Sequence, residues 1–272
     1  MSKEMKGRVL IIAGSDSGGG AGIQADIKTV TALGGFAMTA ITALTAQNTQ
    51  GVHAIEEVSP DFVYEQIRVV LQDIGADCIK TGMLHRTPII DAVVRALDDF
   101  ASGIPLVVDP VMVAKGGAAL LADDAVSAIF EKIVPRATVL TPNAPEAAAL
   151  SGMEVKSRDD AMEVALNLAN LGPKAVLIKG GHIDEGNDIL SDVLLHEGNT
   201  IDVFESKRIK TVHTHGTGCT LASGIAAGIA AGMSIKDAVV RARDYVHTAI
   251  ETAPGFGQGH GPLNHAHTVR ET

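Results

Sequence analysis

Short apolar runs rich in β-branched residues alternate with longer segments of helical periodicity along almost the whole chain. Such alternation is typical of a mostly parallel sheet whose strands are joined by helices. Strands are expected at residues 9–13, 36–46, 77–82, 105–109, 138–140 and 175–179, and a hairpin at 192–209 with its turn at 196–199. Helices are expected at 22–33, 60–71, 88–100, 122–134, 145–150, 158–171, 220–232 and 235–252. We therefore predict an α/β fold, a three-layer sandwich with helices on both faces of a central, mostly parallel sheet.

Length and composition limit the domain count and the partners. No repeat or low-complexity linker divides the 272 residues, so a single domain is predicted over residues 1–272. The net charge is −10, aromatic residues make up 3% of the chain and Trp is absent, so no nucleic acid partner is expected. Cys78 and Cys219 form neither a disulfide framework nor a zinc set, and no signal-peptide core follows the N-terminus. These features predict a cytoplasmic protein.

The uncharged stretch 216–235 is about long enough to span a bilayer. Its Gly224, Gly228 and Gly232 follow the spacing of closely packed membrane helices. The stretch is nevertheless rich in Ala, Gly, Ser and Thr and poor in Leu and Phe. We therefore predict a helix buried against the sheet, and no membrane partner.

The start of this helix carries a candidate anion site. Gly216 and Gly218 flank Thr217 and allow the backbone to turn its amides toward one point. A helix N-terminus favours an anion because its first amides are unpaired and its dipole end is positive. Cys219 places an ionisable side chain beside that point, which indicates acyl or phosphoryl transfer. The alternative interpretation is a glycine turn before a buried helix, with an inert cysteine.

A glycine-rich loop at residues 14–22 follows the first expected strand. Its segment 20–25 matches a dinucleotide-binding fingerprint in form, but no acidic residue follows the next strand before Glu56. The chain has no Gly-Lys dipeptide, which excludes a Walker A loop. The loop is therefore predicted to contact a substrate.

Carboxylates follow two further expected strands, Asp109 after one and Glu146 after the next. Ligands of such sheets bind at the carboxyl ends of the strands, and Mg²⁺ typically takes one or two carboxylates together with substrate phosphates. Taken singly, each segment could serve turn formation, since Asp-Pro and Pro-Asn begin many turns. Together with the anion site they predict a centre for phosphate and metal.

The assembled motifs resemble the ribokinase-like superfamily, and within it the hydroxymethylpyrimidine and phosphomethylpyrimidine kinases of thiamine biosynthesis. The matching segments run nearly end to end, at residues 13–17, 19–26, 42–49, 80–84, 109–112, 141–143, 145–147, 179–182, 214–220 and 259–265. The resemblance implies ATP-dependent phosphorylation of a hydroxymethyl group on an aminopyrimidine, and then of the monophosphate. It also implies a homodimer.

The resemblance assigns roles to individual positions. It places the catalytic centre at Gly216, Thr217, Gly218 and Cys219, ATP at Asn143, Lys179 and Thr217, Mg²⁺ at Asp109 and Glu146, and the pyrimidine pocket at Gly14, Asp26, Gln47, Met83 and Val111. In this branch Cys219 would stand where other relatives use an aspartate base. We expect its thiol pKa to be lowered at the helix N-terminus, and the loose transition state of phosphoryl transfer makes little early demand on a base.

Two further features bear on substrate choice. The amide of Gln47 both donates and accepts, which matches the adjacent ring nitrogen and amino group of an aminopyrimidine. The glycine-flanked Lys115, in segment 114–118, is a candidate flap. A pyridoxal or pyridoxine kinase is the alternative function, because it shares the fold, the anion hole and the cysteine. A non-catalytic nucleotide-binding relative is a second alternative, disfavoured by the intact Asp109 and Glu146.

Overall fold

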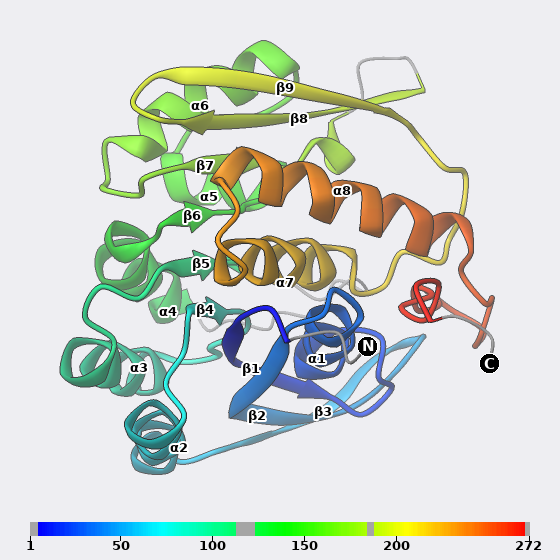
Figure 1. The fold of residues 1–272 in the computed structure, drawn as a ribbon. Coiled ribbons are helices and arrows are strands. Elements are labelled where there is room, and N and C mark those ends of the chain that lie inside the picture. The colour runs from blue at the N-terminus through cyan, green and yellow to red at the C-terminus, as the bar shows by residue number, and fades with distance from the viewer. Residues whose placement is uncertain (1–4, 113–122, 184–187, 270–272) are drawn as a thin grey trace.

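The computed structural model describes residues 5–112, 123–183 and 188–269. Within these residues nine strands form one sheet in the order β3-β2-β1-β4-β5-β6-β7-β8-β9 (Figure 1). The strands are β1 (Arg8–Asp16), β2 (Phe36–Asn48), β3 (Gly51–Glu57), β4 (Cys78–Thr81), β5 (Leu106–Val108), β6 (Val139–Leu140), β7 (Val176–Ile178), β8 (Ile189–His196) and β9 (Thr200–Lys207). The central strands, in the order β2-β1-β4-β5-β6-β7, pair parallel with one another. The outer strands pair antiparallel: β3 with β2, β8 with β7, and β9 with β8.

Helices cover both faces of the sheet, as predicted. One face carries α1 (Gly22–Ala32), α7 (Thr217–Ala230) and α8 (Ile235–Glu251), and the other carries α2 (Pro60–Asp73), α3 (Thr87–Phe100), α4 (Asp123–Ala128), α5 (Ala144–Ser151) and α6 (Arg158–Ala169). Successive side chains of β1 serve opposite faces: Val9 and Ile11 join the core under α1, α7 and α8, whereas Leu10 and Ile12 join the other core. The expected three-layer α/β sandwich with a central, mostly parallel sheet is confirmed.

Three elements differ most clearly from the expected ranges. Strand β1 continues through Gly14 to Asp16, so that the loop after it is shorter than expected. Strand β3 was not anticipated, because most of its side chains are polar or at least partly exposed and it gives little apolar alternation. The helix expected at 122–134 is irregular: α4 ends at Ala128, and a π-helical turn (Ile129–Ile133) and a 3₁₀ turn (Val134–Arg136) follow.

Glycines let α7 and α8 approach closely, and the two helices lie side by side in Figure 1. A Cβ atom on Gly224 would lie 2.9 Å from Cβ of Ala242, and one on Gly228 would lie 2.6 Å from Cβ of Ala238. Gly232 lies beyond the helix, with a φ of 80° that favours glycine. The prediction of a buried helix is confirmed, and no helix in the described part of the chain is long and apolar enough to cross a membrane.

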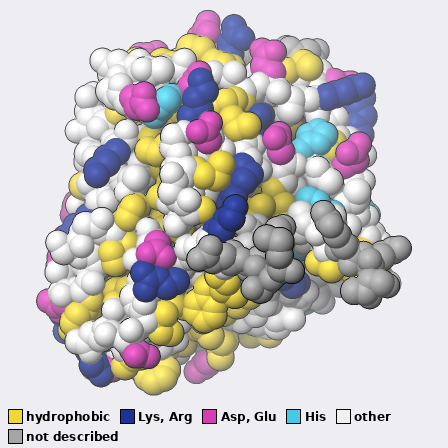
Figure 2. All heavy atoms as spheres, viewed as in Figure 1, with side chains coloured by type: hydrophobic (Ala, Val, Ile, Leu, Met, Phe, Trp, Pro, Cys, Tyr) yellow, Lys and Arg dark blue, Asp and Glu magenta, His cyan; other side chains and the backbone are white. Residues whose placement is uncertain are grey.

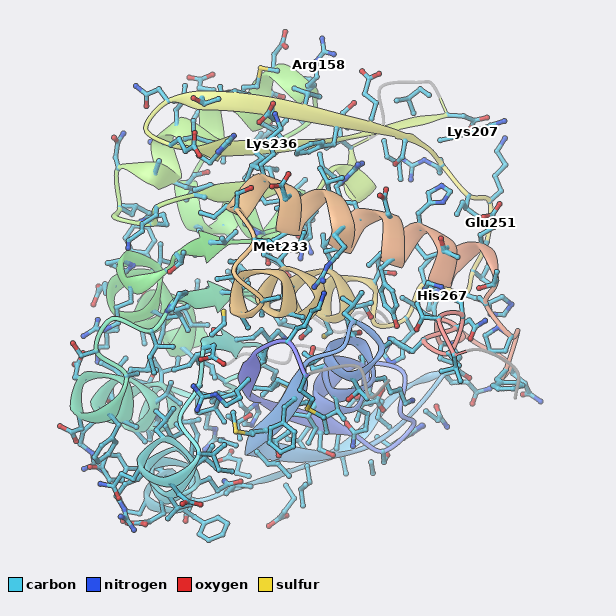
Figure 3. The ribbon with its side chains drawn as sticks, viewed as in Figure 1. Arg158, Lys207, Met233, Lys236, Glu251 and His267 are labelled. Atoms are coloured by element: carbon cyan, nitrogen blue, oxygen red, sulfur yellow. The ribbon has the colours of Figure 1, made fainter. Side chains whose placement is uncertain are left out.

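Helix α8 is also tied to the hairpin at the edge of the sheet. Lys236, in its first turn, donates to the Asp202 carboxylate of β9 at 2.8 Å (Figure 3). On the face shown in Figure 2, basic and acidic side chains are interspersed rather than separated by sign.

Candidate active site

A cavity of about 1040 Å³ opens along the carboxyl ends of the central strands. The strand order reverses beside β1, since β2 lies on one side of it and β4 on the other. Such a switch point is the usual place for a ligand in an open α/β sheet. The polar groups that line the cavity come from distant parts of the sequence and include Gln47, Asp109, Glu146, Lys179, His215 and Cys219.

The N-terminus of α7 forms the middle of the cavity wall. Gly216 precedes the helix with a φ of 86°, and a Cβ atom there would lie 1.9 Å from the carbonyl oxygen of Gly20. No residue other than glycine fits this position. Thr217, Gly218 and Cys219 form the first turn, whose amides have no acceptor within the helix. The structure therefore brings the predicted anion-binding backbone into the cavity.

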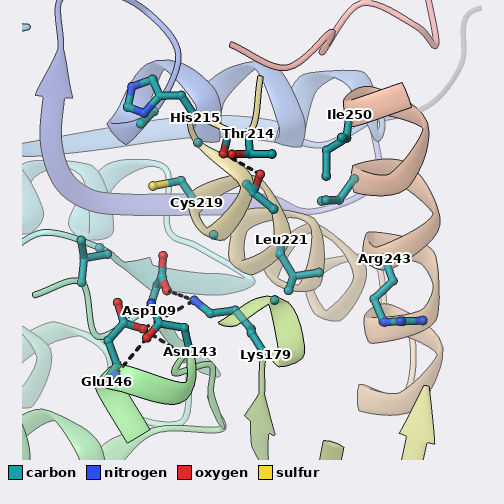
Figure 4. A pocket seen from close by; sticks show the side chains of 18 of the residues that line it. Asp109, Asn143, Glu146, Lys179, Thr214, His215, Cys219, Leu221, Arg243 and Ile250 are labelled. Carbon is teal, nitrogen blue, oxygen red and sulfur yellow. Dashed lines mark hydrogen bonds and ion pairs between the residues drawn. The ribbon is translucent and has the colours of Figure 1, made fainter. Parts of the chain in front are cut away.

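A buried ion pair faces this helix start (Figure 4). Nζ of Lys179, which follows β7, lies 2.9 Å from Oδ1 of Asp109 and 3.7 Å from Oε2 of Glu146. The same Nζ lies 3.3 Å from the place where a Cβ atom of Gly218 would be. Burial opposes the charge of Lys179, but the two carboxylates outweigh it and raise its pKa. Lys179 is a cation held between an acidic pair and the helix amides.

Glu146 is held by turn chemistry as well as by this charge cluster. Asn143 and Glu146 form a capping box at the start of α5: Oδ1 of Asn143 accepts from the Glu146 amide at 2.9 Å, and Oε2 of Glu146 accepts from the Asn143 amide at 2.8 Å. Burial raises the pKa of the Glu146 carboxyl, while nearby Lys179 opposes that shift. The turn and the acidic site proposed as alternatives from sequence therefore occur together.

The donor set suits a hard cation that also binds phosphate. Among the described residues, no group of three or more His, Cys, Asp or Glu side chains could enclose a metal by itself. Asp109 and Glu146 nevertheless both contact the Lys179 ammonium, beside the start of α7. Two carboxylates beside a phosphate site match the way Mg²⁺ is usually bound.

The expected thiolate at Cys219 is contradicted by its surroundings. The thiol is partly exposed to the cavity. Burial nevertheless raises its pKa to about 12; Lys80 opposes this shift, whereas Asp26 and Asp109 add to it. The lowered pKa predicted from the helix N-terminus is wrong, because desolvation dominates and two carboxylates add to it.

Four of the five residues expected in the pyrimidine pocket line one end of the cavity. They are Gly14, Gln47, Met83 and Val111. A Cβ atom on Gly14 would lie 3.2 Å from Sδ of Met83, so these two residues pack together. Asp26 does not line the cavity: it is fully buried beneath it and bound to Lys80. The candidate flap at 114–118 lies outside the described residues.

Asp16 and His215 were not singled out from sequence, although both occur in the motifs. The buried Asp16 carboxylate accepts from the amides of Gly18, Gly20 and Ala21 at 2.8–3.0 Å and contacts Nε2 of His215 at 2.9 Å. Burial opposes its ionisation, but these hydrogen bonds prevail and lower the Asp16 pKa. A short polar residue at the start of a glycine-rich loop was the available signal.

His215 joins this loop to the predicted pyrimidine-reading residue. Its Nε2 also lies 3.2 Å from Nε2 of Gln47, and Oε1 of Gln47 lies 3.1 Å from the Thr45 hydroxyl. Each contact has a closer competitor: one ring nitrogen cannot donate to Asp16 and accept from Gln47 at once, and the Thr45 hydroxyl donates to the carbonyl of Ser15 at 2.9 Å. The Gln47 amide therefore keeps hydrogen-bonding capacity for a ligand. The opposite end of the cavity is walled by α8 and β9, where Arg243 donates to Asp192 at 2.7 Å.

Comparison with known proteins points to one family. The family profile described as phosphomethylpyrimidine kinase matches residues 16–264. A hydroxymethylpyrimidine/phosphomethylpyrimidine kinase of Bacillus subtilis is 47% identical over 258 residues, covering 95% of this chain and 94% of that protein. The thiamine biosynthesis bifunctional protein ThiED of Geobacter sulfurreducens is 48% identical over 260 residues, covering 96% of this chain and 52% of that protein.

A solved structure shows the same architecture. Pyridoxal kinase from Staphylococcus aureus, in complex with AMP-PCP and pyridoxal, aligns with a TM-score of 0.86 and 34% identity. The alignment covers 97% of this chain and 94% of that one. That protein binds an ATP analogue together with a hydroxymethylated aromatic ring.

Proposed function

Since this chain belongs to the phosphomethylpyrimidine kinase family, we propose that its cavity phosphorylates 4-amino-5-hydroxymethyl-2-methylpyrimidine with ATP and then converts the monophosphate to the diphosphate used in thiamine biosynthesis. The observation that carries the proposal is the position of the α7 amides between the Gln47 end of the cavity and Lys179. A phosphoryl group crossing from one end to the other passes this point.

In the reaction, the alcohol oxygen of the pyrimidine forms a bond to the γ-phosphorus while the bond from that phosphorus to the β,γ-bridging oxygen breaks, and ADP leaves. The amides of Gly218 and Cys219 donate to the phosphoryl oxygens as their charge redistributes. Lys179 exchanges its contact with Asp109 for a phosphate oxygen. Mg²⁺, held by Asp109 and Glu146, would neutralise phosphate charge when bound. The deprotonated sulfur of Cys219 accepts the proton that the alcohol loses.

The Gln47 amide supplies the pyrimidine readout. Thr45 and His215 flank the amide, and its donor and acceptor would pair with the ring nitrogen and the amino group of the substrate. Pyridoxal is the second candidate substrate, favoured by the likeness to the Staphylococcus aureus pyridoxal kinase solved with pyridoxal.

The test is a coupled ADP-release assay with the aminopyrimidine alcohol, its monophosphate and pyridoxal in parallel. We expect the two pyrimidines to have the higher kcat/KM, and Asp109→Asn to lose about 10²-fold or more in kcat. Turnover of pyridoxal and of neither pyrimidine would show that the protein is a pyridoxal kinase instead. Undiminished turnover in excess chelator would contradict the assignment of Asp109 and Glu146 to Mg²⁺.

We further propose that the chain forms a single-domain homodimer in the cytoplasm and acts without nucleic acid. The net charge of −10 disfavours a polyanion. Leu44 of β2 is 47% exposed and offers an apolar contact for a second copy. Light scattering of the wild type and of Leu44→Glu tests the association.

A further inference from the structure

Lys80 is a fully buried ammonium group to which the mechanism above gives no task. It lies on the central strand β4, and its Nζ donates to both carboxylate oxygens of Asp26, at 2.9 and 3.0 Å. Both side chains have no exposed surface. Gly82 leaves the space that Lys80 fills, because a Cβ atom there would lie 2.9 Å from Nζ.

Such a pair is weak evidence for stability. Well-packed apolar residues often replace a buried ion pair at no loss of stability, because removing two charges from water is costly. In this protein the two desolvated charges lie at the centre of the sheet, at the floor of the cavity. The pair therefore calls for a role other than holding the fold together.

The pair is joined by a hydrogen bond to α7, the helix that carries Cys219. Asp26 of α1 accepts from Oγ of Ser223 of α7 at 2.6 Å. Ser223 lies four residues after Cys219, so both side chains lie on the same face of α7, the one turned toward α1.

The buried pair also acts on Cys219 electrostatically. Lys80 and Cys219 interact electrostatically in the buried floor of the cavity, and the positive charge of Lys80 favours the deprotonated sulfur. Asp26 acts in the opposite direction but less strongly. The net field of the buried pair at the sulfur is therefore positive.

We propose that Lys80, anchored by Asp26 and Ser223, is a positioning residue that fixes Cys219 against α1 and supplies the positive charge facing its sulfur. This proposal rests on the proposed function, in which Cys219 takes the alcohol proton. In this role Lys80 acts through Asp26 and Ser223 rather than on the transferred phosphoryl group.

The test uses two variants that separate charge from anchoring. Asp26→Asn with Lys80→Met removes both charges and keeps an oxygen for Ser223. Ser223→Ala keeps both charges and removes the anchor to α7. Thr29→Val is the matched control, because Thr29 is a fully buried residue of α1 whose hydroxyl bonds only its own helix, to the carbonyl of Ala25.

The main readout is the rate at which iodoacetamide alkylates Cys219, located by mass spectrometry and followed against pH. Cys78 has no exposed surface and serves as the internal reference. We expect the charge-free double variant to react about tenfold more slowly at a given pH, as for a rise of one pKa unit, and kcat to fall while KM for ATP stays within about twofold. Ser223→Ala should lower kcat without slowing alkylation, and Thr29→Val should change neither.

A purely structural role makes the opposite prediction. Loosened packing would expose the thiol, so alkylation in the double variant would become faster or stay unchanged, and that result overturns the proposal. If the double variant does not fold, a wild-type kcat in Ser223→Ala overturns the anchoring. Absence of kinase activity in the wild type would refute the proposed function instead, while the alkylation rates would still report on Lys80.

Discussion

Nζ of Lys179 lies 2.9 Å from Oδ1 of Asp109, so that a side-chain ammonium neutralises the carboxylate proposed to hold Mg²⁺. The ammonium also lies 3.7 Å from Oε2 of Glu146. Before a nucleotide arrives, the chain thus supplies its own cation to the acidic centre. Binding of a metal nucleotide has to displace this cation.

Lys179→Met should therefore strengthen divalent metal binding to the nucleotide-free protein while lowering ATP turnover. Removing the ammonium leaves two buried carboxylates without their counter-ion. We expect the Kd for Mn²⁺, measured by electron paramagnetic resonance, to fall about tenfold, on the order of one close charge interaction. Lys236→Met removes an exposed ion pair with Asp202 and is the matched control. Weaker Mn²⁺ binding in Lys179→Met would show that the ammonium does not compete with the metal.

The high pKa of Cys219 predicts a pH dependence for kcat. If the deprotonated sulfur accepts the proton, its population rises with pH toward a pKa of about 12, so kcat should increase between about pH 7 and 9. Cys219→Asp should flatten this rise, because an aspartate carboxylate is ordinarily already deprotonated throughout that range. Cys219→Ala keeps the backbone amide and should lose about 10²-fold or more in kcat with little change in nucleotide Kd. A wild-type kcat in Cys219→Ala, with chemistry rate-limiting, would make the cysteine a packing residue.

Gln47→Leu should change the choice of substrate. The variant loses the amide donor and acceptor that lie beside His215 and Thr45. We expect KM for the aminopyrimidine to rise about tenfold, on the order of one or two lost hydrogen bonds, and KM for pyridoxal to rise less. Steady-state assays with both alcohols measure the ratio. Equal increases for the two substrates would remove Gln47 from pyrimidine recognition.

Gly228→Leu should destabilise the protein by overpacking the contact between α7 and α8. Its Cβ atom would lie 2.6 Å from Cβ and 2.9 Å from Cα of Ala238, so the helices would have to separate. The free energy of unfolding in urea should fall by about 1–3 kcal/mol. Gly51→Leu is the control, because a Cβ atom at Gly51 meets nothing within 4 Å. Equal losses in both variants would contradict the steric explanation.

Periodicity was enough to predict the layers and most of the strands, because each buried segment repeats a strong apolar signal. Strand β3 was not predicted, because pairing with β2, rather than apolar burial, holds it in the sheet. The motifs likewise indicated most of the cavity wall. The state of Cys219 was not predictable, since it depends on how Asp26, Lys80 and Asp109 are arranged in space. For the same reason, Asp26 could be taken for a cavity residue although it lies beneath.

The contact between Gly216 and the carbonyl of Gly20 also bears on when the cavity comes into being during synthesis. The two glycines belong to opposite ends of the chain, yet the turn of one is shaped against the backbone of the other. Strands β1, β2 and β4 are complete in the nascent chain well before residue 216 is translated. The turn proposed to bind phosphate needs the last quarter of the polypeptide, so an interrupted translation product would carry Gln47 without that turn.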